Sequence, residues 1–190
     1  MDSYIKLLFD RLESTVFSGR QQEASSYEEG MRWLVDAFTA VKRKQGCAYF
    51  VGNGGSAAIA SHMTADFMKN GGMKTCSLYD SSVMTCMGND YGYEQVFSRP
   101  LGRLINEGDL LVAISSSGRS PNILSAINTA KEKKATVITF TGFAPDNPAR
   151  KSGDLSVYVP CDKYGIVESI HNLILQQAVD EILERDGTGE

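Results

Sequence analysis

The amino-acid sequence predicts an α/β fold, a three-layer α-β-α sandwich around a mainly parallel, five-stranded sheet. Strand-like and helix-like segments alternate along most of the chain. Residues 110–114 are apolar throughout, as in a strand that helices cover on both faces. A glycine-rich turn at residues 52–55 joins an apolar strand to a helix, as in a βα unit. The 190 residues are expected to form a single domain.

The spacing of apolar residues places the individual elements. Two amphipathic helices precede the first strand, which is more than one α/β layer needs, so residues 1–45 are expected to pack partly on another subunit. Residues 46–185 then form the α/β core, and the glycine-rich residues 88–93 form a turn. The expected helices span residues 2–18, 27–44, 57–70, 83–87, 94–106, 121–134 and 166–185. The expected strands span residues 47–51, 75–78, 110–114, 136–140 and 155–159.

The composition, 42% apolar and 22% charged, is typical of a soluble globular protein. A net charge of −4 argues against a nucleic-acid partner, because protein surfaces that bind nucleic acids are basic. No apolar stretch reaches the length of a membrane span, and no signal peptide is visible, so no membrane partner is expected. The four cysteines include no Cys-x-x-Cys pair, which favours reduced thiols and a cytoplasmic location.

The turn Gly52-Asn-Gly-Gly and the helix after it predict an anion site, because this unit directs backbone N–H groups and a helix N-terminus at a ligand. Ser56 is expected to be the N-cap of that helix. The turn lacks the third glycine and the acidic residue of a dinucleotide-binding fingerprint, and no Gly-Lys-Ser/Thr follows it, so no nucleotide cofactor is expected. A glycine-rich turn that serves only the fold is the alternative.

A serine-rich loop follows the apolar strand at residues 110–114. Ser115, Ser117 and Ser120 offer hydroxyls, and the helix that starts near Pro121 offers its positive end. Both loops follow strands of a parallel sheet, and ligands of such sheets bind beyond the carboxyl ends of the strands. A phosphate cradle without metal or lysine is therefore favoured over a turn that only caps a helix.

These motifs resemble the sugar isomerase (SIS) domain and, more narrowly, the bacterial phosphoheptose isomerases. Residues 52–56, 88–92 and 114–120 carry a resemblance that covers nearly the whole chain. It implies a flavodoxin-like sheet and a homotetramer with active sites at subunit interfaces. The implied activity is ketose–aldose isomerisation of sedoheptulose 7-phosphate to D-glycero-D-manno-heptose 7-phosphate, for heptose biosynthesis. The implied contacts to the phosphosugar are Asn53, Gly54, Ser56, Asp90, Ser115, Ser116, Ser117 and Ser120.

The catalytic positions depart from the family pattern. Where the family has His-x-x-x-Glu, this chain has His62 and Asp66, four residues apart on one helix face. An aspartate carboxylate falls about 1–1.5 Å short of a glutamate's, and misplacement on that scale can cost on the order of a hundredfold in rate. On the last helix, Glu168 replaces a glutamine and Gln176 replaces a histidine, and a glutamine cannot exchange protons as histidine does.

Isomerisation needs a base for a carbon-bound proton and an acid for the oxygens. In one reading Glu168 or Asp66 is the base and His62 is the other proton carrier, with Gln176 at the same site. In several family members the corresponding four positions hold zinc, so the resemblance implies a divalent metal on His62, Asp66, Glu168 and Gln176; this oxygen-rich set would also suit harder cations than zinc. His171 is expected to support the packing of its helix.

Two further readings stay open. The altered residues could match a related phosphosugar rather than a heptose phosphate. The protein could also bind a phosphosugar or a protein partner without turnover, as a sensor or in the manner of the replication-initiator-associating SIS proteins. Turnover of ketose phosphates separates the first two readings from the third.

Overall fold

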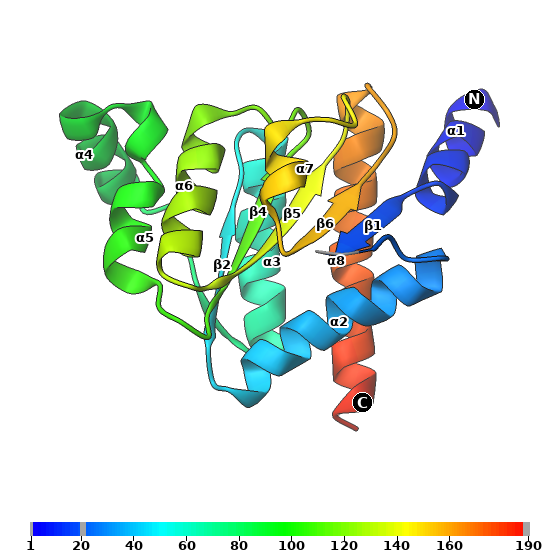
Figure 1. The fold of residues 1–190 in the computed structure, drawn as a ribbon, viewed down its shortest axis with the longest axis horizontal. Helices are drawn as coiled ribbons and strands as arrows, with labels where there is room; N and C mark the ends of the chain where they lie inside the picture. The colour runs from blue at the N-terminus through cyan, green and yellow to red at the C-terminus, as the bar shows by residue number, and fades with distance from the viewer. Residues whose placement is uncertain (1, 20–21, 188–190) are drawn as a thin grey trace.

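The structure is a computed structural model that describes residues 2–19 and 22–187, and it has one six-stranded sheet between helical layers (Figure 1). The strand order is β1-β6-β5-β4-β2-β3, and every pair is parallel except β1 with β6. The strands are β1 Val16–Gly19, β2 Cys47–Val51, β3 Lys74–Cys76, β4 Leu110–Ser115, β5 Thr136–Thr141 and β6 Leu155–Tyr158. The helices are α1 Asp2–Glu13, α2 Tyr27–Arg43, α3 Gly55–Lys69, α4 Ser81–Tyr91, the 3-10 helix η1 Tyr93–Gln95, α5 Ser98–Leu104, α6 Pro121–Glu132, α7 Pro148–Ser152 and α8 Tyr164–Arg185. None of these helices is long and apolar enough to cross a membrane.

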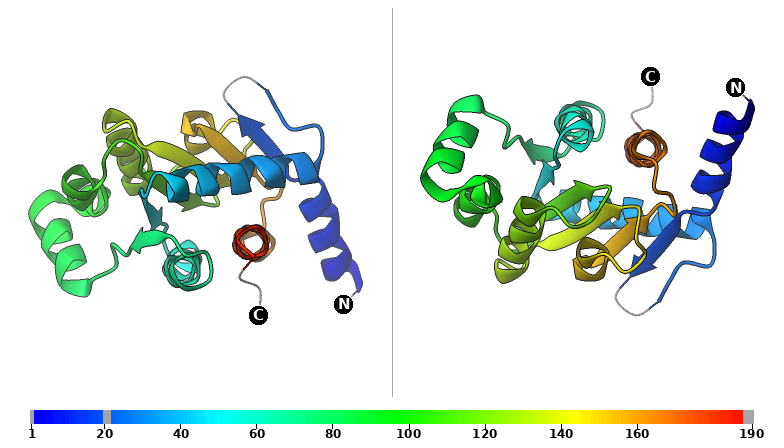
Figure 2. Two further views of the ribbon diagram at one scale, coloured as in Figure 1. Left: turned by 90° about the horizontal axis from the view of Figure 1, so that it is seen from below. Right: turned by 90° about the horizontal axis from the view of Figure 1, so that it is seen from above.

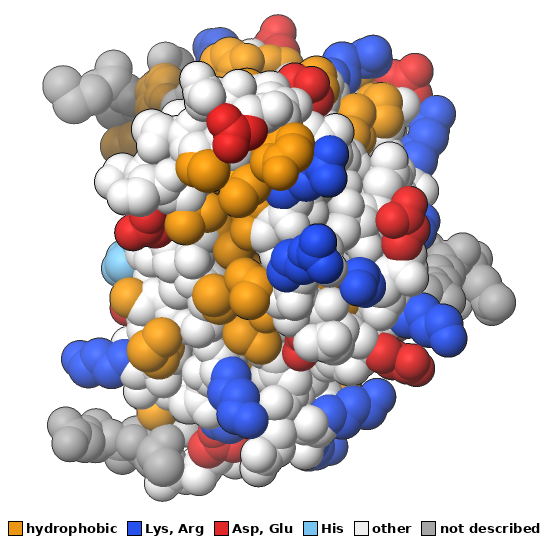
Figure 3. Space-filling view, turned by 90° about the vertical axis from the view of Figure 1, so that its left-hand side faces the viewer, with side chains coloured by type: hydrophobic (Ala, Val, Ile, Leu, Met, Phe, Trp, Pro, Cys, Tyr) orange, Lys and Arg blue, Asp and Glu red, His pale blue; other side chains and the backbone are white. Residues whose placement is uncertain are grey.

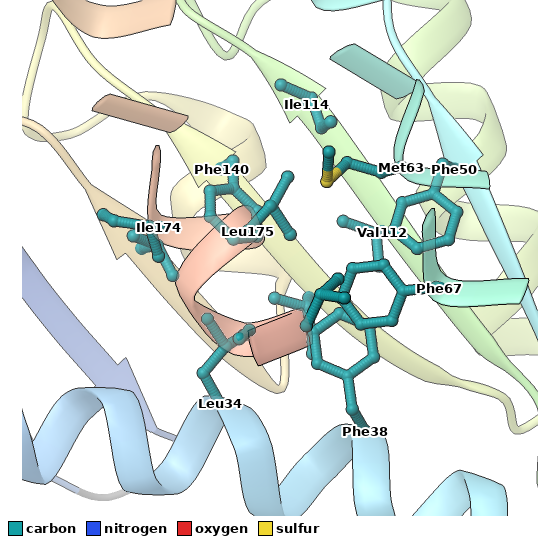
Figure 4. Close-up of a cluster of buried hydrophobic side chains, with 14 of the residues drawn as sticks. Leu34, Phe38, Phe50, Met63, Phe67, Val112, Ile114, Phe140, Ile174 and Leu175 are labelled. Atoms are coloured by element: carbon teal, nitrogen blue, oxygen red, sulfur yellow. The ribbon is translucent and has the colours of Figure 1, made fainter. Parts of the chain in front are cut away.

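Helices cover both faces of the sheet, as predicted. Figure 2 shows α3 and α8 on one face and α6 and α7 on the other. The larger core cluster lies between the sheet and α2, α3 and α8 (Figure 4). Its aromatic centre is formed by Phe38, Phe50 and Phe67, with ring centroids 4.3 to 6.4 Å apart. All six residues of β4 are buried, which confirms the prediction of a strand covered on both faces.

The sheet has one strand more than predicted. Residues 2–18 were expected to form one helix, but α1 ends at Glu13 and β1 follows. The Ser14 hydroxyl donates to the Asp10 carbonyl at 2.7 Å and the Thr15 hydroxyl to the Arg11 carbonyl at 2.9 Å, and such local bonds compete with a continuing helix. The chain then turns back, and β1 pairs with β6 as an antiparallel edge strand.

The predicted turn at residues 88–93 is mostly helical. Residues 83–87 were expected to form a short helix, but α4 runs from Ser81 to Tyr91 and ends where Gly92 adopts a φ of 86°. The Asp80 carboxylate caps the start of α4 by accepting two backbone N–H groups. None of its residues is fully buried, and Met84 packs at the margin of the smaller core cluster.

The topology places the two predicted anion loops side by side. β2 and β4 are parallel neighbours, with Val51 opposite Ala113, so the loops that follow them meet at one edge of the sheet. Ser56 is not the N-cap of α3 as predicted. Gly54 takes that position with a φ of 55° and no side-chain cap, so the helix begins earlier and Ser56 is buried in its first turn.

The first testable prediction concerns the contact between α2 and β1. Gly30 lies in α2, and a Cβ added there would come within 2.2 Å of the Phe17 ring. Because Phe17 is only 1% exposed and cannot move aside, Gly30→Ala should lower the free energy of unfolding by roughly 1–3 kcal/mol. In α5, a Cβ at Gly102 would meet nothing closer than 3.8 Å. Gly102→Ala should therefore raise the free energy of unfolding by about 0.5–1 kcal/mol. Urea unfolding of both variants measures the opposite signs, and equal effects would contradict the packing argument.

Candidate functional site

The serine loop is held by its own backbone and by a buried asparagine. Gly118 adopts a φ of 62°, and its N–H lies 3.2 Å from the Ser115 hydroxyl. A Cβ at Gly118 would lie 1.9 Å from Oδ1 of Asn147, which is fully buried. The hydroxyl oxygens of Ser115 and Ser120 lie 3.5 Å apart. The loop therefore closes back on itself at the start of α6, with hydroxyls gathered at the helix N-terminus.

The two loops enclose a small cavity of about 130 Å³. Its lining residues are Asn53, Ser56, Ile114, Ser115, Ser116, Ser117, Ser120, Tyr164 and Glu168. The Ser116 side chain is 4% exposed, and within the described part of the chain its hydroxyl has no hydrogen-bond partner. A buried hydroxyl of this kind normally has a partner, so a ligand oxygen in the cavity would satisfy it. The volume is well below the ~300 Å³ of a typical ligand pocket, so the cavity fits one end of a ligand.

The first loop is fixed by side chains from three other elements. Asn53 and Asn122 exchange two hydrogen bonds, at 3.0 and 2.8 Å. The hydroxyl of Tyr93 also donates to Asn53 Oδ1 at 3.1 Å. The Tyr79 hydroxyl accepts the Gly52 N–H at 2.7 Å and donates to the Gly52 carbonyl at 2.8 Å. Burial raises the pKa of Tyr79, so that hydroxyl stays protonated and keeps both bonds.

Glu168 closes one side of the cavity. Its position in α8 sets its carboxylate against the first turn of α3, where a Cβ at Gly55 would lie only 2.3 Å from Glu168 Oε2. A carboxylate is favoured at a helix N-terminus by the helix dipole. Gly55 is therefore needed for close approach, and Glu168 lines the same cavity as the serine hydroxyls.

His62, Asp66 and Gln176 meet where α3 and α8 pack together. Asp66 Oδ2 lies 3.1 Å from His62 Nε2 and accepts a hydrogen bond from Gln176 Nε2 at 2.6 Å. The Asp66 side chain is 20% exposed and that of His62 is 56% exposed. Both contacts use Oδ2, and Oδ1 of Asp66 accepts no hydrogen bond from the described residues.

The described part of the structure does not bring the four residues that the resemblance assigns to a metal into a complete ligand set. Gln176 presents its NH₂ group to Asp66, and an amide NH₂ is not a metal ligand. Within residues 2–19 and 22–187, no group of three or more His, Cys, Asp or Glu side chains could hold a metal ion. The divalent metal stays a prediction, which elemental analysis of protein purified without chelator can test.

The structure brings together most of the predicted site residues. Six of the eight predicted phosphosugar contacts line the cavity, and Gly54 is the N-cap of the adjoining α3. Asp90 does not line it: this exposed carboxylate of α4 accepts a hydrogen bond from Asn89 at 2.8 Å. The turn that was expected to carry Asp90 to the site is helical, so its role as a sugar contact stays a prediction for a fuller assembly.

Sequence reasoning missed five residues of the site. Tyr164 and Ile114 line the cavity, and Tyr79, Tyr93 and Asn122 bind the first loop. The tyrosine at position 93 belongs to the glycine-rich stretch that was singled out, and Asn122 directly follows the proline that marks the start of α6. Those neighbours were the available signals, but neither spacing indicates which side chains would meet across the sheet edge.

His171 supports packing, as predicted, and gives a pH-dependent stability. It is fully buried, and its Nε2 lies 3.1 Å from the Thr141 carbonyl. Burial lowers the pKa of His171 from 6.5 to about 4. Below pH 6.5 the unfolded chain binds a proton that the native state refuses until about pH 4, so stability should fall as the pH drops through this window.

The loss attributable to His171 should reach about 3 kcal/mol of unfolding free energy at pH 4. Urea unfolding of the wild type and of His171→Gln between pH 7 and pH 4 measures it. A slope that persists in His171→Gln would contradict the assignment.

Comparison with known proteins places the chain in a family. The model of the SIS domain family matches residues 17–142. A phosphoheptose isomerase of Burkholderia pseudomallei (strain K96243) is 38% identical over 166 residues, which cover 84% of this chain and 83% of that protein. The structure of a phosphoheptose isomerase from Francisella tularensis superposes with a TM-score of 0.82 at 26% identity, covering 96% of this chain and 94% of that one. The corresponding values for the Neisseria gonorrhoeae phosphoheptose isomerase are 0.74 and 30%, over 80% and 84%. The chain therefore belongs to the SIS domain family and, within it, to the phosphoheptose isomerases.

Proposed function

We propose that this protein is a phosphosugar ketose–aldose isomerase that converts sedoheptulose 7-phosphate to D-glycero-D-manno-heptose 7-phosphate for heptose biosynthesis. The observation that carries the proposal is one helix pair, α3 and α8, that borders the serine-lined cavity at one end and holds His62, Asp66 and Gln176 further along. Relatives and solved structures named phosphoheptose isomerase support the choice of sugar.

The distance between the serine-lined cavity and Asp66 suits a long sugar. The residues of α8 that mark them, Glu168 at the cavity and Gln176 beside Asp66, are about 12 Å apart along the helix axis. A terminal phosphate held by the serine hydroxyls would leave an extended carbon chain reaching along α3 toward Asp66. A short triose phosphate would leave most of that distance unspanned.

The chemistry needs only proton transfers within the substrate. In the ketose-to-aldose direction a C1–H bond breaks and a C2–H bond forms, while a proton leaves the C1 hydroxyl and another reaches the C2 oxygen. Asp66, through its Oδ1, takes the proton from C1 and returns it to C2. His62, beside it at 3.1 Å, exchanges the oxygen-bound protons. Gln176 holds the Asp66 carboxylate in place.

Glu168 is proposed to contact hydroxyls of the sugar rather than to act as the base. Its carboxylate lines the phosphate end of the site and lies against Gly55, away from the Asp66 carboxylate. A carboxylate accepts hydrogen bonds only, so it orients sugar hydroxyls as donors. Glu168→Gln should therefore change KM more than kcat.

A homotetramer is part of the proposal. α1 leaves Tyr4, Ile5 and Phe9 between 50% and 56% exposed. Figure 3 shows hydrophobic side chains gathered on the side of the molecule where α4 and α5 lie, and exposed residues of these helices include Val83 and Leu104. Such contiguous apolar surface typically marks an interface. Sedimentation analysis should give four times the 20.7 kDa chain mass.

A panel of five- to seven-carbon ketose phosphates, assayed with and without added divalent metal, tests the function. Turnover of sedoheptulose 7-phosphate is expected. Ser117→Ala should raise KM roughly 10- to 100-fold, because it removes a hydrogen bond to a charged phosphate. Ser169→Ala, at an exposed hydroxyl that bonds the Gly165 carbonyl within α8, is the matched control and should match the wild type.

Two outcomes would redirect the proposal. Turnover of a different ketose phosphate, but not of the heptulose, would change the substrate. Binding of phosphosugars without turnover of any of them would favour a sensor or a partner protein over an enzyme.

A further inference from the structure

The orientation of the Asn53 amide follows from a chain of hydrogen bonds that begins in α6. Asn122 lies in the first turn of α6 and is 2% exposed. Its Oδ1 accepts Asn53 Nδ2 at 3.0 Å and the backbone N–H of Ile123 at 3.1 Å, an N–H that is shared with the Ser120 carbonyl. Only an amide oxygen can accept two N–H groups, so the backbone of α6 determines which way round the Asn122 amide lies.

That orientation is passed on to Asn53. With the Asn122 oxygen committed, Asn122 Nδ2 faces Asn53 Oδ1 and donates to it at 2.8 Å. Tyr93 donates to the same oxygen at 3.1 Å. Asn53 Oδ1 therefore accepts two hydrogen bonds, which is its capacity.

Asn53 consequently presents a hydrogen-bond donor to the cavity. One hydrogen on Asn53 Nδ2 goes to Asn122, and among the described residues the second has no acceptor. Asn53 lines the cavity together with the serine hydroxyls. A hydrogen-bond donor at this place complements an anionic or carbonyl oxygen of a ligand.

We propose that Asn122 and Tyr93 are positioning residues that hold the Asn53 amide as a hydrogen-bond donor to an oxygen of the bound phosphosugar. The inference rests on the proposed function for the identity of the ligand. Neither residue needs to touch the substrate. Tyr93 follows α4, so the exposed α4 segment is joined to the site through this hydroxyl.

The variant Asn122→Asp tests the proposal with a readout that packing alone would not move. A protonated aspartic acid can imitate the asparagine, because its carbonyl oxygen accepts two N–H groups and its O–H donates to Asn53 Oδ1. An ionised aspartate has no hydrogen to donate, so its carboxylate repels Asn53 Oδ1. The Asn53 amide should then turn so that its Nδ2 faces residue 122. The affinity of the variant should fall at least tenfold as its carboxyl group ionises, relative to the wild type at each pH.

The probes are sedoheptulose 7-phosphate and inorganic phosphate, with dissociation constants measured by calorimetry from pH 4.5 to pH 8. Glu168, Tyr79 and Tyr93 face the same loops, but they are present in both proteins, so the ratio of the two affinities isolates residue 122. A ratio that stays constant with pH for both probes would overturn the proposal.

Tyr93→Phe provides a second measurement if Asn122→Asp fails to fold. Tyr93 is 57% exposed, so the fold should survive, and loss of one neutral hydrogen bond should weaken phosphosugar binding about fivefold. Tyr91→Phe, at a tyrosine 47% exposed and two residues away, is the control. Equal affinity in Tyr93→Phe and Tyr91→Phe would contradict the role of Tyr93. Wild-type protein that binds the phosphosugar but does not turn it over would count against the isomerase alone and leave this inference in place.

Discussion

Replacing Asp66 with asparagine is expected to lower kcat for sedoheptulose 7-phosphate by a factor of about 10²–10⁴, the usual contribution of a positioned acid or base. The amide keeps the size of the carboxylate and can still accept from Gln176, which donates to it at 2.6 Å in the wild type. It cannot take a proton from C1. KM should change little, because Asp66 lies beyond the phosphate cavity. Steady-state kinetics in a coupled assay measures both constants.

The matched control is Asp36→Asn. Asp36 is an exposed carboxylate that pairs with Arg185 at 2.7 Å, so the same chemical change there should leave kcat unaltered. Glu168→Gln distinguishes the two carboxylates of the site. If Glu168→Gln abolished turnover while Asp66→Asn retained it, the base would be Glu168 and the assignment of Asp66 would be wrong.

Replacing Gly118 with alanine is the second change with a large expected effect. Its φ of 62° costs an L-residue about 1–2 kcal/mol, and the new Cβ would lie 1.9 Å from Asn147 Oδ1. Asn147 cannot yield, because it is fully buried and its amide bonds the Gly142 and Ala144 carbonyls and the Arg150 N–H. The serine loop must shift instead, and a shift of about 1 Å should weaken phosphosugar binding about a hundredfold.

Gly108→Ala separates backbone strain from the clash. Gly108 has a φ of 93°, but a Cβ there would meet nothing within 4 Å. Both variants should lose stability from the strain, and only Gly118→Ala should lose ligand affinity. Calorimetry with inorganic phosphate and urea unfolding measure the two effects, and equal phosphate affinity in both variants would contradict the account of the loop.

The fold could be predicted from the sequence because its strongest signals are local. Residues 110–114 are apolar without interruption, and only a strand buried on both faces requires that pattern. The two anion loops follow such strands, and a parallel sheet leaves one edge for both. The strand β1 was missed because four residues at an antiparallel edge carry too short a pattern to separate from the end of a helix.

Only those parts of the site whose residues lie close together in the sequence could be predicted. Serine hydroxyls within one loop, and His62 and Asp66 on one helix face, follow from spacing. Contacts between distant segments do not. Asn53 meets Asn122 across 69 residues, and Gln176 meets Asp66 across 110, and no periodicity encodes either meeting. The turn around Asp90 was wrong for a related reason, since Asp80 caps a helix that continues through it.

Because residue 55 has no side chain, α3 and the carboxylate of Glu168 from α8 can lie in direct contact. The Glu168 side chain therefore packs against the first turn of α3 and lines one side of the cavity. The two positions therefore do not tolerate substitution equally. A variant designed to bind a bulkier ligand should carry a shorter side chain at residue 168 and keep the glycine at residue 55. A side chain at residue 55 would push the Glu168 carboxylate into the cavity.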